Sequence, residues 1–505
     1  MTRYLRPLAI VLSTLASVPA HAEWHEAKSD HFRIYADAPE AWVRRYADRL
    51  ERFDATMRIV RNVPSQPSDL ANPVTVYVVP DVDAIQALYS RKANMVAGFY
   101  VPRMASVAYV PRESRGRAGS GDATLFHEYA HHIMFRATRI GLPKWYAEGF
   151  AEVFSAALIA DDGRVDVGRQ AGHRAPTLLN AQSLPIEKLL SGDDNGNGDL
   201  FYGRAWLLTH MLTFDKSRAG QVTKYLTLLS GGTPNLEAAQ QAFGDLRALD
   251  RAMDSYMARP LTYTSFNADR VKPGPIVVRA LSAGEAAMMP IRLRSDRGVK
   301  KAEAPAIVGD ARQLAGPFAT DPGAQTALAE AEFDAGNDAQ ADAAADRALA
   351  IDASNIDALL YKGHVAQRRA VDAKATDAAT WKVVRSWYSK AATARPDAAE
   401  PLAAFYSTYG KQGIAPTANA SAALLKAFEN APQDPNLRFA AAREMLRLGQ
   451  VSQARQALIP LAFNPHAQAK TNFALQLVKM IDAGEPAEKV AAAVPAKPDD
   501  DDDTD

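Results

Sequence analysis

The chain has 505 residues, of which 48% are hydrophobic and 23% are charged, an ordinary composition for a soluble globular protein. This length exceeds what one compact core usually holds, so we expect two or three domains. The 58 basic and 58 acidic residues cancel, which argues against a nucleic-acid partner. Cysteine is absent, which excludes disulfides, thiolate metal ligands and a cysteine nucleophile. Any bound metal must therefore be held by His, Asp and Glu.

The first 22 residues have the pattern of a secretory signal peptide. Arg3 and Arg6 form a short basic start, and residues 8–18 form an apolar run that is too short to span a bilayer. The small-x-small sequence that ends at Ala22 is a typical cleavage site. We therefore expect cleavage after Ala22 and a periplasmic or secreted product with no membrane span in the mature chain. The alternative is an uncleaved N-terminal anchor.

Residues 23–262 have the pattern of an α+β domain in which strands precede helices. Period-two alternation and β-rich runs predict strands, and apolar residues at three- and four-residue steps predict helices. The expected strands are 31–36, 74–79, 96–101 and 106–110. The expected helices are 39–62, 122–138, 143–158, 200–214, 219–229, 235–243 and 246–258. The fold class that follows is a small mixed sheet followed by helices.

The rest of the chain divides into three parts by composition. Residues 263–315 are rich in proline and are expected to be a connector or a small strand-containing subdomain. Residues 316–481 are Ala-rich; a unit that begins near Ala327-Leu328-Ala329 and continues with Gly336 and Ala341 should recur about 34 residues on, and Leu359, Leu360 and Gly363 fit that register. These offsets resemble tetratricopeptide repeats; a plain Ala-rich helical bundle is the alternative. Residues 482–505 are expected to be a disordered acidic tail.

The segment that indicates chemistry is His127-Glu128-Tyr129-Ala130-His131. On a helix, His127 and His131 lie one turn apart and can bind one Zn²⁺, while Glu128 can reach a water without binding the metal. A second helix downstream carries Glu148 and Glu152, again one turn apart. Glu148 would complete a two-His, one-Glu site with an open position for water. Glu152 could accept the second ring N–H of a ligating histidine.

These two motifs together resemble the gluzincin metallopeptidases, especially bacterial peptidase-MA-like exported proteins with C-terminal tetratricopeptide repeats. The resemblance implies a zincin-like domain in which His127, His131 and Glu148 are zinc ligands. It also implies that Glu128 is the general base and that Glu152 supports a ligating histidine. The two motifs cover only about 26 residues, and the wider similarity is one of layout.

A gluzincin also needs a donor for the oxyanion, which the resemblance places at Tyr202, with His210 as the second choice. A Tyr202 that is simply packed in the core is the alternative. His132 is expected not to bind the metal. Residues 107–110 are expected to be an edge strand able to pair with an extended peptide. Residues 193–199 have the early spacing of a calcium loop but lack its final Glu, so we expect a plain turn.

The sequence therefore predicts an exported zinc metallopeptidase that hydrolyses peptide bonds, with one Zn²⁺ and a peptide or protein substrate. The repeats are expected to offer a surface for a protein partner. Two other functions stay open: a repeat-based adaptor with a structural or degenerate zinc site, and a hydrolase of cell-wall amide bonds.

Overall fold

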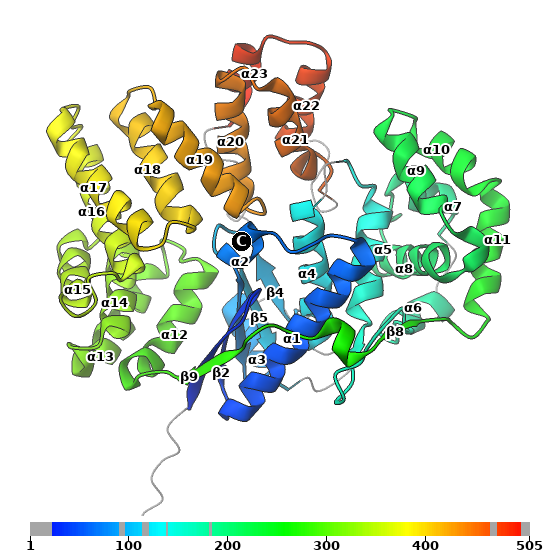
Figure 1. Cartoon of the computed structure of the whole chain (residues 1–505), viewed down its shortest axis with the longest axis horizontal. Coiled ribbons are helices and arrows are strands. Elements are labelled where there is room, and N and C mark those ends of the chain that lie inside the picture. Colours follow the sequence, from blue (N-terminus) through cyan, green and yellow to red (C-terminus); the bar gives the residue numbers. More distant parts are fainter. Residues whose placement is uncertain are drawn as a thin grey trace, which may run out of the picture.

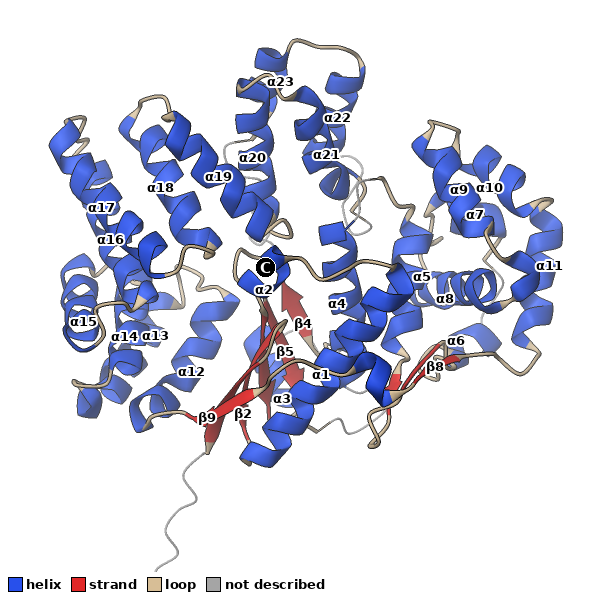
Figure 2. Ribbon diagram, in the orientation of Figure 1, coloured by secondary structure: helices blue, strands red, loops and turns tan. Residues whose placement is uncertain are grey.

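The computed structural model describes residues 23–89, 96–113, 121–137, 140–180, 184–464 and 472–495. The expected signal peptide lies outside these residues, as does the segment 496–505. A small N-terminal sheet region is followed by a long run of helices, so the expected α+β class is confirmed at this level (Figures 1 and 2). Over the described ranges, no helix combines the length and the apolar character needed to cross a bilayer.

A six-stranded mixed sheet with the order β4-β5-β3-β2-β1-β9 forms the centre of the N-terminal region. Strands β2, β3 and β5 are parallel to one another. Strand β1 pairs antiparallel with β2, β9 pairs antiparallel with β1, and β4 pairs antiparallel with β5. The strands are β1 (Trp24–Lys28), β2 (Phe32–Asp37), β3 (Val74–Val79), β4 (Phe99–Val101), β5 (Val107–Pro111) and β9 (Val277–Ala280). The two faces alternate along each strand, so that Val76 and Tyr77 belong to different hydrophobic clusters.

The prediction that residues 107–110 form an edge strand is wrong. Strand β5 lies between β3 and β4, and all five of its residues are buried. The sequence predicts strands at 96–101 and 106–110, which pair as β4 and β5, but the pattern does not tell which of the two is outermost. The three-residue β4 is the edge, and it pairs with residues 107–109 of β5.

Helices cover both faces of the sheet. On one face α1 (Glu40–Arg61) and α4 (Gly121–Ala137) pack together, and the rings of Phe53 and Phe126 stack with centroids 3.9 Å apart. The other face contacts α3 (Val82–Tyr89) and α12 (Ala283–Arg297). Because both faces are covered, the central strands β3 and β5 are apolar except for Thr75.

A helical group continues from α4 on the right of Figure 1. Helix α5 (Lys144–Ser155) packs against both α4 and α8 (Gly198–Phe214). The shorter elements around them are α6 (Ala175–Asn180), α7 (Ile186–Ser191), α9 (Gln221–Ser230), α10 (Asn235–Phe243) and α11 (Leu246–Met257). A second, three-stranded sheet is formed by β6 (Leu158–Ile159), β7 (Val165–Val167) and β8 (Thr264–Phe266). Helix α2 (Pro67–Ala71) follows α1.

The segment expected to be a connector, residues 263–315, ties the two halves of the chain together. Its strand β8 pairs with β7, and its strand β9 pairs with β1 at the end of the main sheet. Helices α12 and α13 (Ala304–Ala315) follow. Both strands thus extend sheets that the N-terminal region begins.

From α12 to α23 the chain forms a helical array in which consecutive helices pack against one another. The array curves from the sheet, where α12 lies, to the region above α2, where α19 and α20 lie (Figure 1). Its further helices are α14 (Pro322–Asp334), α15 (Asp338–Ile351), α16 (Ile356–Asp372), α17 (Ala378–Ala394), α18 (Ala399–Gln412), α19 (Ala418–Asn430), α20 (Pro435–Arg447), α21 (Val451–Ala462), α22 (Phe473–Asp482) and α23 (Ala487–Ala493).

Small residues lie at matching places in two helix pairs of the array. Gly336 and Gly449 have φ angles of 80° and 73° in the turns that end α14 and α20. Ala341 and Ala454, five residues later, are fully buried at the start of the next helix. Helices α14 and α16 begin 34 residues apart, but α16 and α18 begin 43 apart. The longer spacing follows from the 17-residue length of both α16 and α17.

The expectation of a disordered tail from residue 482 is wrong for residues 487–494. Helix α23 packs against α20, and Val490 and Val494 are buried in the last cluster of the array. These two valines lie one turn apart, so even an Ala- and Pro-rich stretch can cover the end of the array. The backbone carbonyl of Pro495 also accepts a hydrogen bond of 2.7 Å from Arg443.

The array depends on close helix contacts that glycine permits. A Cβ at Gly363 on α16 would lie 2.5 Å from the buried ring of Tyr388 on α17. We expect Gly363→Ala to lower the free energy of unfolding by about 1–3 kcal/mol, because the ring has to move. The control is Gly309→Ala in α13, where no atom lies within 4 Å. This variant should be neutral or up to about 1 kcal/mol more stable. Urea unfolding measures both; equal effects would contradict the packing argument.

Candidate metal centre

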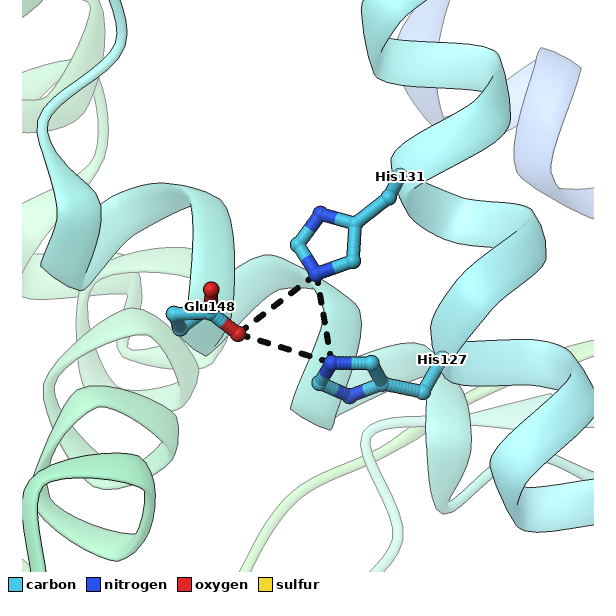
Figure 3. A group of neighbouring side chains, drawn as sticks. All are labelled: His127, His131 and Glu148. Carbon is cyan, nitrogen blue, oxygen red and sulfur yellow. Dashed lines mark hydrogen bonds and ion pairs between the residues drawn. The ribbon is translucent and has the colours of Figure 1, made fainter. Parts of the chain in front are cut away.

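The two histidines of the site share one face of α4. Leu125, Phe126 and Tyr129 of this helix are buried in the main hydrophobic cluster and fix its rotation against α1 and the sheet. Because that face of α4 packs into the core, His127 and His131, which lie one turn apart, both point toward Glu148 on α5 (Figure 3). Their Nε2 atoms are 3.2 Å apart.

The position of Glu148 is fixed by the packing of the start of helix α5. Pro143 precedes the helix with φ −63° and ψ 144°, and the following Trp145 is fully buried. The Trp145 indole donates a hydrogen bond of 3.2 Å to the hydroxyl of Tyr225 on α9. Glu148 lies one turn beyond this anchor and is itself fully buried.

Gly149 allows α5 to lie against α8. A Cβ at this position would be 2.3 Å from the backbone oxygen of Ala205 and 2.2 Å from the hydroxyl of Thr209. No larger residue fits without moving α8. The Glu-Gly sequence of the second motif is therefore a packing requirement, and α8 carries Tyr202 toward the same region.

The three side chains expected to bind zinc point toward one another (Figure 3). Glu148 Oε2 lies 3.4 Å from His127 Nε2 and 3.5 Å from His131 Nε2. Donors on a tetrahedral ion with bonds of about 2.0–2.1 Å are about 3.3 Å apart. The separations of 3.2, 3.4 and 3.5 Å therefore fit three ligands of one zinc ion.

The electrostatics of the site also favour a cation. Burial alone would raise the pKa of Glu148, but the hydrogen bonds of the two imidazoles outweigh burial and hold that pKa well below its usual range. Burial disfavours the charged form of His127, yet contacts with Glu148 and Glu152 raise its pKa to about 10. Carboxylates that hold a proton on an imidazole this strongly form a site that also attracts a metal cation.

Glu152 supports His127 from the side away from the three donor atoms. Its Oε1 lies 3.3 Å from His127 Nδ1, which leaves Nε2 facing His131 and Glu148. His173 and Arg174 contact the same carboxylate at 2.9 and 2.6 Å. The hydrogen bonds of His127, His173 and Arg174 outweigh burial and lower the pKa of Glu152. Glu152 is therefore an ionised partner for the ring N–H of His127.

The sequence analysis does not identify His173 and Arg174. They precede the short helix α6, about twenty residues after Glu152, and no periodic pattern connects them with α5. The one available signal is two adjacent basic residues before a proline-containing helix, which is too common to indicate a site.

Tyr202 and Glu128 lie beside the three donors. The ring of Tyr202 is 6.2 Å from the ring of His127, and the Arg174 guanidinium lies 5.1 Å from the Tyr202 ring centroid. Burial and the charges of Glu148 and Glu152 raise the pKa of Tyr202, so its hydroxyl stays protonated. Glu128 is close enough for its charge to raise the pKa of both His127 and Tyr202.

The other two histidines near these motifs have structural contacts. His132 Nδ1 lies 2.7 Å from the hydroxyl of Tyr100 on β4, which connects α4 to the sheet edge. His210 contacts the hydroxyl of Tyr256 at 3.0 Å and the backbone oxygen of Gly168 at 2.7 Å, so both ring nitrogens are engaged. Tyr202 therefore remains the better placed of the two oxyanion donors considered.

The loop at residues 193–199 uses its side chains to hold its own backbone. Asp193 and Asp194 accept hydrogen bonds from the backbone N–H groups of Asn195 and Gly196, at 2.8 and 3.0 Å. Asn197 accepts one from Leu200 and caps α8. These contacts are those of a turn that begins a helix.

A second group of potential metal ligands consists of His31, Glu51 and Asp54. His31 Nδ1 lies 2.8 Å from Glu51 and 3.3 Å from Asp54, while Asp54 also accepts hydrogen bonds from Arg58 and from the hydroxyl of Tyr129. Arg58 pairs with the Asp54 carboxylate, whereas His31 contacts both Asp54 and Glu51. We interpret this group as an ion-pair network that holds the β1–β2 turn on α1.

Comparison of the chain with protein-family models and with curated proteins gives no match. The geometry described above therefore stands on its own as the basis for a functional proposal.

The His31 network predicts a dependence of stability on pH. Burial lowers the pKa of His31, but the hydrogen bond with Glu51 and the charge of Asp54 outweigh burial and raise it. The contribution of His31 to the stability of the fold is therefore complete below its unfolded pKa of about 6.5. This contribution is lost as the pH rises through the higher pKa of the folded state. We expect the stability difference between wild type and His31→Gln to be larger at pH 6 than at pH 9, measured by urea unfolding.

The control is Arg44→Gln, which breaks the exposed Glu40–Arg44 pair. The effect of this variant on stability should be the same at pH 6 and pH 9, because it leaves the His31 network intact. A His31→Gln effect that does not change with pH would mean that the network works without the imidazolium.

Proposed function

We propose that the chain is an exported zinc metallopeptidase of the gluzincin type, with a zincin-like N-terminal region and tetratricopeptide-like repeats. The observation that supports this proposal is the convergence of His127 Nε2, His131 Nε2 and Glu148 Oε2 within 3.5 Å of one another. These are the donor types that zinc binds, at separations that a tetrahedral ion requires.

A catalytic site is favoured over a structural one by the number of donors. Structural zinc sites usually have four protein ligands, often including cysteine, whereas catalytic sites have three and leave one position for water or substrate. Within the described residues this group has three members, and the chain has no cysteine. Glu128 and Tyr202 add an acid–base group and a hydroxyl donor beside the three ligands.

In the proposed reaction, a bound zinc ion would act as a Lewis acid and lower the pKa of a water toward about 7. Glu128 accepts the proton of the attacking water and donates it to the leaving amine. The Tyr202 hydroxyl donates a hydrogen bond to the carbonyl oxygen of the scissile bond as negative charge develops there. Glu152 keeps the His127 ring oriented through its Nδ1 atom.

Zinc content and peptide hydrolysis together test the proposal. We expect about one zinc per chain in wild type and Glu128→Gln, and none in Glu148→Ala, which loses one of three ligands. Hydrolysis of a peptide library should occur with wild type and be lost in both variants. The matched control is His31→Asn in the other His–carboxylate group, which should keep zinc and activity.

Hydrolysis by purified Glu128→Gln protein would overturn the role of Glu128. A wild-type protein that binds no zinc and cleaves no peptide would overturn the enzyme proposal and favour a repeat-based adaptor. Cleavage of cell-wall fragments but not peptides would keep the site and change the substrate.

Removing the hydroxyl of Tyr202 tests its part in catalysis. Loss of one oxyanion donor costs about 2.7–4 kcal/mol in comparable sites, or about 10²–10³-fold in kcat. We therefore expect Tyr202→Phe to lower kcat by that factor while KM and zinc content stay close to wild type. A change confined to KM would assign Tyr202 to substrate binding instead.

A further inference from the structure

Arg174 lies between two helices that carry residues of the candidate metal centre. Its Nη2 and Nε atoms donate hydrogen bonds of 2.6 and 3.1 Å to the two carboxylate oxygens of Glu152 on α5. Its Nη1 atom donates one of 3.0 Å to Asp199 in the first turn of α8. The Arg174 guanidinium also lies over the ring of Tyr202, which is three residues further along α8. One side chain therefore contacts both α5 and α8.

These contacts use different parts of the guanidinium group. Its N–H groups lie in the plane of the group, and all three nitrogen atoms donate to carboxylates. The face of the plane stays available for an aromatic ring, so an arginine can pair with a carboxylate and contact a ring at the same time. The distance of 5.1 Å from the Tyr202 centroid is within the range of a cation–π interaction. A lysine, which has no planar face, cannot replace both contacts.

The contact between Arg174 and Glu152 lies in the interior. The Glu152 side chain is 2% exposed and the Arg174 side chain 20% exposed. Water therefore screens this pair less than it screens a surface ion pair, and removing one partner leaves a buried charge without its full compensation. A Glu152 carboxylate that is free on one side can move, and the His127 ring that it contacts at Nδ1 would move with it.

The backbone that carries Arg174 is held against α8. His210 on α8 donates a hydrogen bond of 2.7 Å from Nε2 to the backbone oxygen of Gly168, six residues before Arg174. On the other side of Arg174, α6 packs onto α8, and a Cβ at Gly203 would lie 3.1 Å from a leucine side chain of α6. Gly203 directly follows Tyr202, so α6 approaches α8 beside that tyrosine. The segment thus places Arg174 at a fixed distance from α8.

We propose that Arg174 is a positioning residue of the candidate active site, which holds Glu152 against the His127 ring and holds the Tyr202 hydroxyl beside the metal ligands. This inference rests on the proposed function and goes beyond it, because it makes the support of a metal ligand and the placement of the oxyanion donor depend on one side chain. It also gives the segment between β7 and α6 a role in the site.

Zinc affinity tests the link through Glu152 and needs no turnover. Zinc-loaded, full-length protein is titrated with a chelator of known affinity. Loss of a group that orients a ligating histidine costs about 10–100-fold in metal affinity, and we expect Arg174→Gln to cost about tenfold, because His173 still contacts Glu152. In a Glu152→Ala background the same substitution should cause no further loss, because the group through which Arg174 acts is then absent.

Turnover of zinc-saturated protein tests the link to Tyr202. We expect Arg174→Gln to lower kcat by about tenfold, a part of the roughly 10²–10³-fold that loss of an oxyanion donor costs, while KM stays close to wild type. In a Tyr202→Phe background the substitution should lower kcat little further. Arg174→Lys keeps the charge and should restore zinc affinity in part, but it should not restore kcat, since an ammonium group lacks the planar face that contacts the ring.

The matched control is Arg312→Gln in the helical array. Arg312 donates two hydrogen bonds of 2.7 Å to the two carboxylate oxygens of the buried Glu332, so this variant breaks an ion pair of the same form far from the site in sequence. It should change neither zinc affinity nor kcat. Thermal unfolding establishes that each variant is folded, and if Arg174→Gln does not fold, Arg174→Lys is compared with wild type instead.

The outcomes distinguish the inference from the function on which it rests. Wild-type zinc affinity and kcat in Arg174→Gln would overturn the inference and leave the metallopeptidase proposal intact. A loss of zinc affinity that is equally large without Glu152, or a loss of kcat that is equally large without the Tyr202 hydroxyl, would overturn the corresponding link and assign Arg174 to the general stability of the fold. A wild-type protein that takes up no zinc would overturn the proposed function and the inference with it.

Discussion

The structure of the site depends on one constraint, the complete burial of the Glu148 carboxylate. An ionised carboxylate in the interior is costly unless cationic or hydrogen-bonding groups surround it. His127 and His131 supply those contacts, and they can do so only if α5 is held at one distance and one rotation from α4. The buried Trp145 fixes the start of α5, and Gly149 lets the helix lie against α8. The surrounding helices therefore serve to keep one negative charge beside two imidazoles, which is also the arrangement that a divalent metal ion requires.

The sequence predicts those parts of the site that repeat within one helix. His127 and His131 are four residues apart, as are Glu148 and Glu152, and helical periodicity alone places each pair on one face. The convergence of the two pairs is expected because two histidines need a third ligand to hold a metal ion, and the resemblance implies it as well, but no pattern within one helix contains it. The contacts of Arg174 with Glu152 cannot be predicted from a sequence pattern. Arg174 lies in a loop, and it meets Glu152 only because separate elements pack together.

Sequence patterns are local, and this also explains where the observed fold differs from the expected one. Strands β1 and β9 pair across about 250 residues of sequence, and both are short and partly polar, so their alternation is weak evidence. The order of β4 and β5 depends on which of the two strands pairs with β3. Because both have similar apolar sequences, the pattern does not distinguish them. The last helix is hidden by composition, because Val490 and Val494 stand among alanines and become buried only when this segment packs against α20 and α22.

Arg438 shows why the position of the array could not be derived from its repeats. In an Ala-rich helix, an arginine usually lies in solvent, but here it is buried and burial lowers its pKa to about 10. Carbonyl groups at the end of α4 and in α21 compensate for this cost. At the other end of the array, the Arg292 guanidinium on α12 lies 4.5 Å from the centroid of the Tyr35 ring on the sheet. An array attached at both ends, to the sheet and to the metal-binding helix, braces the region between them. The C-terminal part of α4, four residues beyond His131, is therefore held by a residue more than 300 positions away in the sequence.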